Sequence, residues 1–393
     1  MGLFQSHGCA RLGLEVFMNL AKKLIGWYDK EGREGLPWRE NPQPYHVWIS
    51  EIMLQQTRVD TVMEYYRRFL EALPDVQTLA EADEDMLLKL WQGLGYYSRV
   101  KNLKKAAEII VRDREGRIPS EKKDLETLPG IGSYTAGAIS SIAFQKREIA
   151  ADGNAYRVAA RLCQEDGLLE KRETRKRLEA FLRENLPDDR PGDFNQALMD
   201  LGSGICLPHQ KPLCSSCPIC EFCKAYKNSD PLNYPKKKEK RTRRIEKKTV
   251  FLIQRERFTL LVRRPDQGLL AGLWALPMVD GHLPSEKIDQ AIEEILGNKP
   301  LESPGRTYLG KARHIFSHIE WHMEGWAVHL KDQGEENRKK EEALCESRYF
   351  KEKSEPYFEK LAPDQVWASR KDLCEKYSIP SAFEFYLSEE MAD

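Results

Sequence analysis

The N-terminal part of the chain repeats a pattern of apolar residues with helical spacing. In residues 14–30 the apolar positions fall three and four residues apart, which places them on one face of an amphipathic helix. The same period recurs at 47–54, 59–70, 84–92, 99–113, 121–128, 173–185 and 193–204. Almost no strand pattern occurs before about residue 225. Residues 14–224 are therefore predicted to form an all-α domain.

The pattern changes to strands in the C-terminal part. Strands fit 249–253, 259–262, 307–309 and 320–330, and helices fit 285–296 and 370–377. Residues 249–393 are therefore predicted to form a separate α+β domain, so the fold class is multi-domain.

A basic segment, residues 225–248, joins the two predicted domains. Residues 224–248 hold eleven lysine and arginine residues against three acidic residues, and they include Pro231 and Pro235. A solvated linker and a linker whose charges also contact DNA phosphate both fit this composition.

Composition limits the classes of protein that the chain can represent. Its 393 residues favour two or three domains, and 41% hydrophobic residues suffice for ordinary cores. The formal net charge is zero, so any binding of nucleic acid must come from local basic patches. No apolar run is long enough to span a bilayer, and the N-terminus does not resemble a secretion signal. We expect a cytoplasmic protein that does not bind membranes.

The cysteines point to a metal site. Nine cysteines in a chain without an export signal argue against a disulfide framework, and five of them lie within eighteen residues. Cys206, Cys214, Cys217 and Cys223 are separated by seven, two and five residues. Four thiolates in one loop can bind zinc or an iron–sulfur cluster, and the spacing alone does not separate the two. Cys220 lies in the same loop and is a fifth candidate ligand.

The stretch Leu128–Asn154 combines a glycine turn, a helical segment and an acidic residue. Gly130 and Gly132 allow a tight turn and a close approach of the backbone to a partner. The helix that follows would direct unpaired N–H groups at an anion such as DNA phosphate. Asp152 comes shortly afterwards. A phosphate cradle next to a carboxylate suggests chemistry on a nucleic acid.

Two carboxylates are candidates for catalysis. Glu51 lies within the apolar run Val47–Leu54, so it occupies either a solvated helix face or a desolvated site in which its pKa would rise. Asp152, followed by Gly153 and Asn154, fits an ordinary helix N-cap as well as a catalytic group. If the fold brought them together, they would supply the two carboxylates that glycosidic bond cleavage uses.

Gln56, Tyr96 and Tyr97 lie in predicted turns between helices. Amides and aromatic rings on turns can wedge into a base stack. Tyrosines can also pack into a core or lie on the surface. The residues alone leave both interpretations open.

Taken together, these features resemble the helix-hairpin-helix DNA glycosylase superfamily. LPGIGSYTAGAI resembles the superfamily's hairpin motif, and the whole helix-hairpin-helix would span about residues 124–144. Asp152 lies at the position of the superfamily's catalytic Asp. The iron–sulfur loop resembles residues 206–223, which begin at the end of FNQALMDLGSGIC. Within the superfamily, the MutY-type adenine DNA glycosylases resemble the chain at LPWR, VWISEIMLQQTRV and GLGYYSR. The C-terminal domain resembles the Nudix-like domain of the same family more weakly.

The resemblance implies a role for each candidate residue in excision of adenine. Glu51 would protonate adenine at N7, and Asp152 would stabilise the resulting oxocarbenium ion. Tyr134 would hydrogen-bond near Asp152, and Asn154 would help to place groups around the water. The adenine pocket would be lined by Arg39 and Gln196.

The resemblance also implies contacts with DNA and one 4Fe–4S cluster. The DNA-contacting residues would be Gln56, Thr57, Tyr96, Gly130 and Gly132, together with Phe316, Ser317 and His318, which would recognise 8-oxoguanine. The cluster ligands would be Cys206, Cys214, Cys217 and Cys223. We therefore expect a monomer that acts on 8-oxoguanine:adenine or guanine:adenine mispairs in duplex DNA, at the nucleoid of a bacterium.

Two alternatives are weighed against this hypothesis. The endonuclease III branch carries a lysine nucleophile in the hairpin, where this chain has Tyr134, and tyrosine cannot form a Schiff base. A DNA-binding protein that carries a cluster but has no activity is the second alternative. The glutamate-rich Nudix helix is missing from the sequence, so nucleotide pyrophosphohydrolase activity is not expected.

The chain departs from the family pattern at two places. Seven residues separate Cys206 from Cys214, where the family usually has six, and alanine occupies positions 151 and 155, where bulkier aliphatic residues are common.

Overall fold

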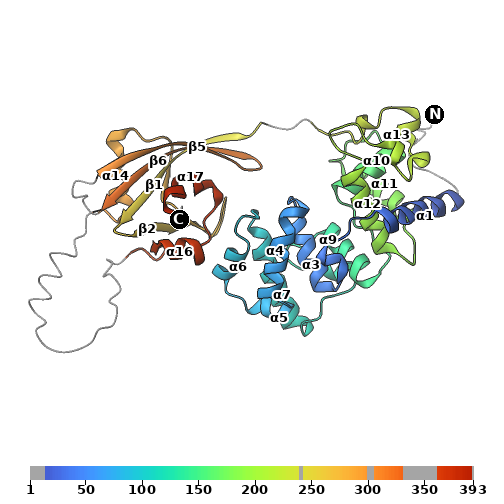
Figure 1. Ribbon diagram of the computed structural model, residues 1–393, viewed down its shortest axis with the longest axis horizontal. Coiled ribbons are helices and arrows are strands. Elements are labelled where there is room, and N and C mark those ends of the chain that lie inside the picture. Colours follow the sequence, from blue (N-terminus) through green and yellow to red (C-terminus); the bar gives the residue numbers. More distant parts are fainter. Residues whose placement is uncertain (1–13, 239–241, 299–304, 331–360, 392–393) are drawn as a thin grey trace, which may run out of the picture. The chain divides into compact units, whose positions relative to one another are not determined.

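The computed structural model describes residues 14–238, 242–298, 305–330 and 361–391. The chain divides into two compact units, one made of Met1–Ala82 and Ser98–Lys240 and one made of Asp83–Tyr97 and Arg241–Asp393. The first is helical, and the second contains a β-sheet (Figure 1). This confirms the predicted combination of an all-α and an α+β fold. In the described part of the chain, no helix combines the length and the apolar character that a membrane span needs.

Short helices joined by turns make up the first unit. They are α1 (Leu14–Glu31), α2 (Pro37–Glu40), α3 (Pro44–Leu54), α4 (Val59–Ala72), α5 (Val76–Glu81), α7 (Ser98–Arg114), α8 (Lys122–Leu125), α9 (Ser133–Ala138), the π-helix η1 (Ile139–Ala143), α10 (Gly153–Cys163), α11 (Arg172–Glu184), α12 (Pro191–Gly204) and α13 (Lys224–Asn228). The 3-10 turns η2 (Cys214–Ser216), η3 (Cys220–Phe222) and η4 (Pro231–Asn233) complete it, while α6 (Glu84–Leu90) belongs to the second unit.

Apolar spacing decides which face each helix buries. On α4, Val62, Tyr66 and Phe69 follow one another at helical intervals, and all three are buried. The main core forms where α1, α10, α11 and α12 meet, and its fully buried members include Leu24, Leu178, Phe194 and Ala197. A buried side chain of leucine or phenylalanine size stabilises the fold by roughly 1.5–3 kcal/mol.

The predicted hairpin is formed by α8, a glycine turn and α9. Gly130 has φ of +77°, and a Cβ there would lie 2.7 Å from the Cβ of Asn102, so the turn requires glycine. Gly132 is the N-cap of α9. The predicted helical segment after the glycine turn continues beyond α9 without a break, as the π-helix η1.

A mixed β-sheet organises the second unit. Its strands are β1 (Arg244–Arg255), β2 (Phe258–Arg263), β3 (Trp274–Ala275), β4 (Met278–Asp280), β5 (Gly305–Ile315), β6 (Ile319–Leu330) and β7 (Gln365–Ser369). Among the described residues the strand order is β3-β2-β1-β6-β5, with β4 paired to β1 and β7 paired to β2. The contact between β1 and β6 is parallel, whereas β5 and β6 form an antiparallel hairpin. The strand expected to begin at residue 249 thus begins at Arg244, inside the basic segment.

Helices cover both faces of this sheet. Val250 and Leu252 of β1 pack on one side with Phe383 and Leu387, while Phe251 packs on the other side against α14 (Ile288–Ile295). The remaining elements are η5 (Ser285–Lys287), α16 (Arg370–Glu375), η6 (Ser381–Phe383) and α17 (Glu384–Met391). Figure 1 shows α14 on the face opposite α16 and α17. The alternation along β1 therefore fills two separate cores.

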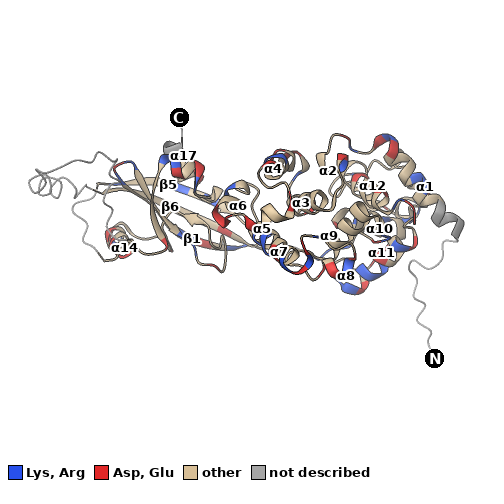
Figure 2. Cartoon of the chain, turned by 90° about the horizontal axis from the view of Figure 1, so that it is seen from below, with Lys and Arg blue, Asp and Glu red and all other residues tan. Residues whose placement is uncertain are grey.

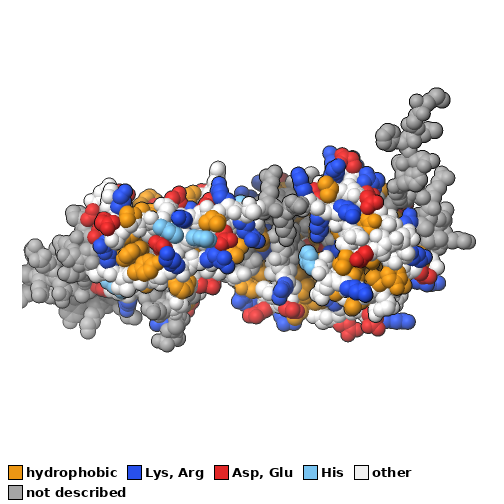
Figure 3. Space-filling model, turned by 90° about the horizontal axis from the view of Figure 1, so that it is seen from above, with side chains coloured by type: hydrophobic (Ala, Val, Ile, Leu, Met, Phe, Trp, Pro, Cys, Tyr) orange, Lys and Arg blue, Asp and Glu red, His pale blue; other side chains and the backbone are white. Residues whose placement is uncertain are grey.

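Charges of both signs are interspersed over the elements, in keeping with a formal net charge of zero. Both basic and acidic residues lie on α8 and on α11 (Figure 2). On the face drawn in Figure 3, hydrophobic side chains form small scattered groups among charged ones. Binding of a polyanion would thus depend on local arrangements of backbone N–H groups and basic side chains.

Gly137 of α9 lies so close to another backbone segment that a side chain cannot fit. A Cβ there would be 2.1 Å from the carbonyl oxygen of Ile149. We expect Gly137→Ala to lower the free energy of unfolding by about 1–3 kcal/mol through overpacking, measured by urea denaturation. Gly26→Ala on α1 is the matched control, because it meets no atom within 4 Å and should stabilise the helix by about 0.5–1 kcal/mol. Equal effects of the two substitutions would contradict this account of the hairpin packing.

Candidate functional site

Glu51 lies on α3 and is buried with only 5% of its surface exposed. Pro44 at the start of α3 fixes the first turn, and the apolar residues that surround Glu51 draw this helix into the core. Of the two interpretations drawn from the sequence, the desolvated one is therefore correct. The hydroxyl of Tyr134 donates a hydrogen bond of 2.6 Å to Oε2 of Glu51.

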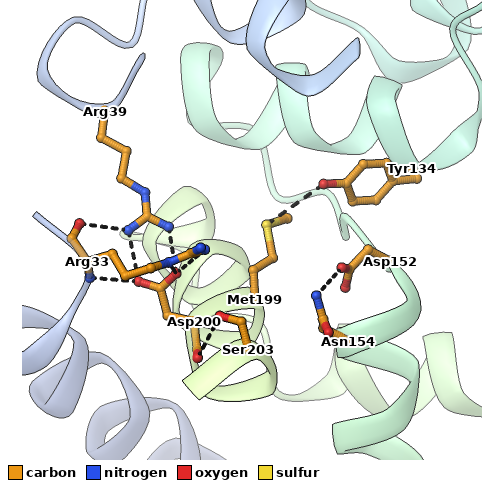
Figure 4. A network of polar contacts seen from close by, with 8 residues as sticks. All are labelled: Arg33, Arg39, Tyr134, Asp152, Asn154, Met199, Asp200 and Ser203. Carbon is orange, nitrogen blue, oxygen red and sulfur yellow. Dashed lines mark hydrogen bonds and ion pairs between the residues drawn. The ribbon is translucent and has the colours of Figure 1, made fainter. Parts of the chain in front are cut away.

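Tyr134 reaches Glu51 from the hairpin. It is the second residue of α9, directly after the glycine turn, and it lies 83 residues further along the chain. Its hydroxyl also lies 3.8 Å from Sδ of Met199 on α12 (Figure 4). The hairpin thus delivers a buried hydroxyl to the carboxyl group, in addition to its glycine turn.

Asp152 is the N-cap of α10, and its carboxylate is fully engaged by the first turn of that helix. Oδ1 accepts a hydrogen bond of 2.7 Å from the backbone N–H of Ala155, and Oδ2 accepts one of 2.7 Å from Nδ2 of Asn154 (Figure 4). The N-cap interpretation is therefore correct. It does not exclude a second role, because the same carboxylate acts electrostatically on Glu51 and Tyr134.

The loop that leads into Asp152 is held by Asn195, a fully buried residue of α12 that the sequence did not single out. Its Oδ1 accepts a hydrogen bond of 3.1 Å from the N–H of Ala150, and its Nδ2 donates to the carbonyl of Glu148 at 2.9 Å. Nδ2 also donates to Oγ of Ser141 at 2.9 Å. One amide on α12 therefore fixes the backbone just before Asp152.

Burial gives the two carboxyl groups unusual acid strengths. Desolvation raises the pKa of Glu51 to about 7; the hydrogen bond from Tyr134 and the charge of Arg39 oppose the rise, and the charge of Asp152 adds to it. Desolvation also raises the pKa of Asp152, while its hydrogen bonds to Ala155 and Asn154 lower it. Near neutral pH, Glu51 can therefore hold a proton that an ordinary glutamate has lost.

A pocket opens beside Glu51, and Arg39 is fixed within it. The pocket is lined by Arg33, Leu36, Trp38, Arg39, Val47, Ser50, Glu51, Leu54, Val59, Ile142, Gln196 and Met199. Nη1 and Nη2 of Arg39 donate to the two carboxylate oxygens of Asp200 at 2.8 and 2.9 Å. Nε of Arg33 donates to the same carboxylate at 2.6 Å (Figure 4). Arg39 and Gln196, expected from the sequence, thus line one pocket with Glu51.

Asp200 was not anticipated, although the sequence held a signal for it. It lies four residues after Gln196 on α12, so the two side chains project from the same face of the helix. The pKa of Asp200 is lowered by Arg39 and Arg33 against the desolvation that raises it, so the carboxylate stays charged. Asp200 therefore orients Arg39 in the pocket through a bidentate ion pair.

A chain of hydrogen bonds runs from Asp152 to the cysteine loop through Arg157, which the sequence also did not single out. Nη2 of Arg157 donates to Oδ1 of Asn154 at 2.8 Å and to the carbonyl of Gly202 at 2.7 Å. Nε donates to the carbonyl of Cys206 at 2.9 Å. Through these bonds, the position of Asn154 depends on the backbone at the start of the loop.

The cysteines expected to bind a cluster lie close to one another. Cys206, Cys217 and Cys223 pack against the main core, and Cys220 lies in the 3-10 turn η3. Burial, together with the charges of Cys206, Cys223 and Cys220, raises the pKa of Cys217 to about 12, while a hydrogen bond from the backbone of Ile219 opposes the rise. Burial and neighbouring thiols likewise raise the pKa of Cys214. Neighbouring thiols that disfavour each other's ionisation form a donor set suited to a cationic centre.

A buried cation faces this donor set. Nη1 of Arg161 lies 3.1 Å from Sγ of Cys206, and Nε of Arg161 donates to the carbonyls of Pro231 and Tyr234 at 2.9 and 3.1 Å. Within the described ranges, no three His, Cys, Asp or Glu side chains converge on a site for a single metal ion. The cysteines, together with the fold, are consistent with an iron–sulfur cluster.

The residues expected to probe DNA lie on exposed turns. Gln56, in the turn after α3, is exposed and has φ of +57°, and Thr57 follows it. Tyr96, in the second unit, is 46% exposed and has φ of +49°. Within that unit the hydroxyl of Tyr96 lies 3.0 Å from Oγ of Ser317.

Phe316, Ser317 and His318 form the tight turn between β5 and β6. The ring of Phe316 packs edge-on against Trp321 with centroids 4.9 Å apart, and its N–H donates to the carbonyl of Ile319 at 2.8 Å. Ser317 and His318 are exposed at the tip of the turn, and the Ser317 hydroxyl is the one that lies within hydrogen-bond distance of Tyr96.

Comparison with known proteins identifies the class of this fold and site. Residues 49–184 match the HhH-GPD superfamily of base excision DNA repair proteins, and residues 249–389 match the NUDIX domain. The first match contains Glu51, Tyr134 and Asp152, and the second contains the Phe316–His318 turn. The chain thus combines a base excision repair fold with a Nudix-like one.

Whole-chain relatives are more specific. Adenine DNA glycosylase of Rattus norvegicus is 34% identical over 366 residues, which cover 79% of this chain and 70% of the relative. The Mus musculus protein of the same name is 36% identical, covering 76% of this chain and 68% of the relative. The protein of that name from Buchnera aphidicola subsp. Schizaphis graminum is 33% identical, covering 76% and 84%. The chain belongs to the family of adenine DNA glycosylases.

Burial of Glu51 should make stability depend on pH. The pKa of Glu51 is about 7 in the folded protein, above the value of 4.5 of a free glutamate. Its favourable contribution is therefore complete below about pH 4.5 and is lost as the pH rises through about 7. The glutamine in Glu51→Gln cannot ionise. We therefore expect the melting temperature of this variant, relative to that of the wild type, to increase from pH 5 to pH 8. Differential scanning fluorimetry measures the gain, and Glu64→Gln on the exposed face of α4 is the control for removal of one charge. A constant difference for Glu51→Gln across this pH range would contradict the prediction.

Proposed function

We propose that this protein excises adenine from 8-oxoguanine:adenine and guanine:adenine mispairs in duplex DNA. The observation that carries the proposal is the buried Glu51, which keeps a proton near neutral pH while Tyr134 and Asp152 act on it from two other helices. A proton donor beside a second carboxylate is the arrangement that glycosidic bond cleavage uses. The relatives named adenine DNA glycosylase support adenine as the base that is removed.

The residues of the pocket divide the reaction between them. Adenine flipped out of the stack enters the pocket beside Arg39 and Gln196. Glu51 donates its proton to N7, the N-glycosidic bond breaks, and its electron pair leaves with the neutral adenine. Asp152 stabilises the positive charge on the sugar, and Asn154 holds the Asp152 carboxylate. A water then adds to the sugar carbon and gives one proton to the Glu51 carboxylate, which leaves an abasic site and restores the acid.

Tyr134 favours hydrolysis over lyase chemistry. It occupies the hairpin position at which a lysine would attack the sugar, and a phenol cannot form the Schiff base that strand cleavage requires. In the structure its hydroxyl is directed at Glu51 instead. We propose that Tyr134 orients the Glu51 carboxyl group. Endonuclease III-like activity is therefore not favoured.

Recognition of DNA is assigned to exposed turns and to the hairpin. Backbone N–H groups after Gly130 and Gly132 would bind phosphate, and Gln56, Thr57 and Tyr96 would probe the base stack. Phe316, Ser317 and His318 would recognise 8-oxoguanine. Such a division makes excision depend on both bases of the mispair. We propose that the protein acts as a monomer on chromosomal DNA, which in a bacterium means the cytoplasmic nucleoid.

We further propose that Cys206, Cys214, Cys217 and Cys223 hold one 4Fe–4S cluster. The mutual effect of the thiols on their ionisation and the guanidinium group of Arg161 beside Cys206 support this assignment. A cluster held by these four cysteines would cross-link the loop, and the steps of the hydrolysis are assigned to Glu51 and Asp152. The loop's link to Asn154 through Arg157 makes its order relevant to the site.

A glycosylase assay tests the function directly. The protein is incubated with an 8-oxoguanine:adenine duplex, and heating in alkali then reveals abasic sites as strand breaks. We expect a break at the adenine, and a loss of about 100-fold or more in single-turnover rate for Glu51→Gln and for Asp152→Asn. The wild-type rate should fall as the pH rises above about 7, where Glu51 loses its proton.

Matched duplexes separate the alternatives. A thymine:adenine duplex should stay intact, and a guanine:adenine duplex should be cut. No break in either mispaired duplex would overturn the proposed function, and tight binding without turnover would favour a non-catalytic sensor. Strand cleavage without alkali at an oxidised pyrimidine would favour endonuclease III-like activity.

Substitution of single cysteines tests the cluster assignment. We expect the purified wild type to show a broad visible absorbance band and about four iron atoms per chain. Cys217→Ser should lose both signals, whereas Cys220→Ser should keep them. A colourless zinc-containing protein would contradict the cluster, and loss of iron in Cys220→Ser alone would change the ligand set.

A further inference from the structure

A buried arginine, Arg99, binds the C-terminal end of α3, the helix that carries the proposed acid. Its Nη1 lies 2.7 Å from the carbonyl oxygen of Gln55, 2.8 Å from that of Ile52 and 2.9 Å from that of Met53. Its Nη2 lies 3.4 Å from Oγ1 of Thr57. The last carbonyls of a helix lack partners within the helix, and a positive charge complements that end of its dipole. Arg99 thus binds groups that α3 leaves open.

The turn held by Arg99 contains a residue in an unfavourable backbone conformation. Gln56 has φ of +57°, where glycine or asparagine is the usual residue after a helix. Such a conformation persists when the surrounding structure fixes it. A second tether supports the turn, because Nε2 of Gln55 donates to Oγ1 of Thr135 at 3.3 Å. The chain therefore has an exposed glutamine at a position where glycine would adopt the same backbone conformation with less strain.

Arg99 itself is not placed to contact DNA. Only 8% of its surface is exposed, and its guanidinium group lies against the last carbonyls of α3 and the turn that follows. The charges that shift the pKa of Glu51 are those of Asp152 and Arg39. An effect of Arg99 on the reaction would therefore pass through the geometry of the turn.

We infer that Arg99 is a positioning residue, which fixes the turn Gln55–Thr57 and thereby sets where the Gln56 side chain meets the base stack. The inference rests on the proposed function, in which Gln56 probes DNA. Lysine cannot replace Arg99 fully, because an ammonium group is a point charge and lacks the planar fork of a guanidinium group.

Hydrogen exchange tests the anchor without reference to activity. The N–H of Thr57 donates to the carbonyl of Leu54 at 3.3 Å, so its exchange reports on the turn. We expect exchange of this amide to be about tenfold faster in Arg99→Met and intermediate in Arg99→Lys. Arg147→Met is the matched control, because Nη2 of Arg147 donates to carbonyls at the end of α11 and not to this turn. Unchanged exchange in folded Arg99→Lys would overturn the inference.

A double-mutant cycle then tests whether the anchor acts through Gln56. Single-turnover excision from an 8-oxoguanine:adenine duplex is measured for Gln56→Ala, Arg99→Lys and the double variant. We expect each single substitution to slow excision about tenfold and the double variant to lie within about twofold of Gln56→Ala, because coupled residues are not additive. The pH at which the excision rate has fallen by half should be the same in Arg99→Lys as in the wild type.

The outcomes separate the inference from the proposed function. Effects that multiply in the double variant, or a full rate in Gln56→Ala, would overturn the action through Gln56. A shifted pH midpoint in Arg99→Lys would place Arg99 in the acid chemistry and overturn a purely positional role. A wild-type protein that never excises adenine would defeat the proposed function, and hydrogen exchange would still decide whether Arg99 fixes the turn.

Discussion

The hydrogen bond between Tyr134 and Glu51 is the contact on which the organisation of the site depends. A carboxyl group with 5% of its surface exposed is unfavourable to bury in charged form, and the Tyr134 hydroxyl donates a hydrogen bond to it. That donor comes from the hairpin, so the element proposed to bind DNA phosphate also supplies a hydrogen bond to the proposed acid. Any displacement of the glycine turn would change both functions together.

Helix α12 supplies the rigid support for the rest of the site. Asn195 holds the backbone before Asp152, Asp200 holds Arg39 in the pocket, and the carbonyl of Gly202 holds Arg157. These residues share one helix whose apolar side packs into the main core through Phe194. Burial of that side fixes the helix, and the helix in turn fixes three polar contacts on separate segments.

Much of the fold could be predicted from the residues, because its elements have strong periodic patterns. The helical period marks α1, α4 and α11 closely, and alternation marks β6. Predictions were weaker where local preference and tertiary packing compete. The residue pattern did not show that the helix after the hairpin turn becomes a π-helix at Ile139, or that Gly137 lies against the backbone of Ile149.

The sequence by itself determined which groups are available: a carboxyl group within an apolar run, a second one at a helix start, a hairpin with tyrosine in it and a cluster of cysteines. Their chemistry is local, so residue type and spacing are enough to suggest it. Only the tertiary structure decided that Glu51 is buried, that Tyr134 donates to it and that Asp200, Arg157 and Asn195 hold the neighbouring groups. These contacts join residues far apart in the chain, and desolvation depends on every element packed around the site.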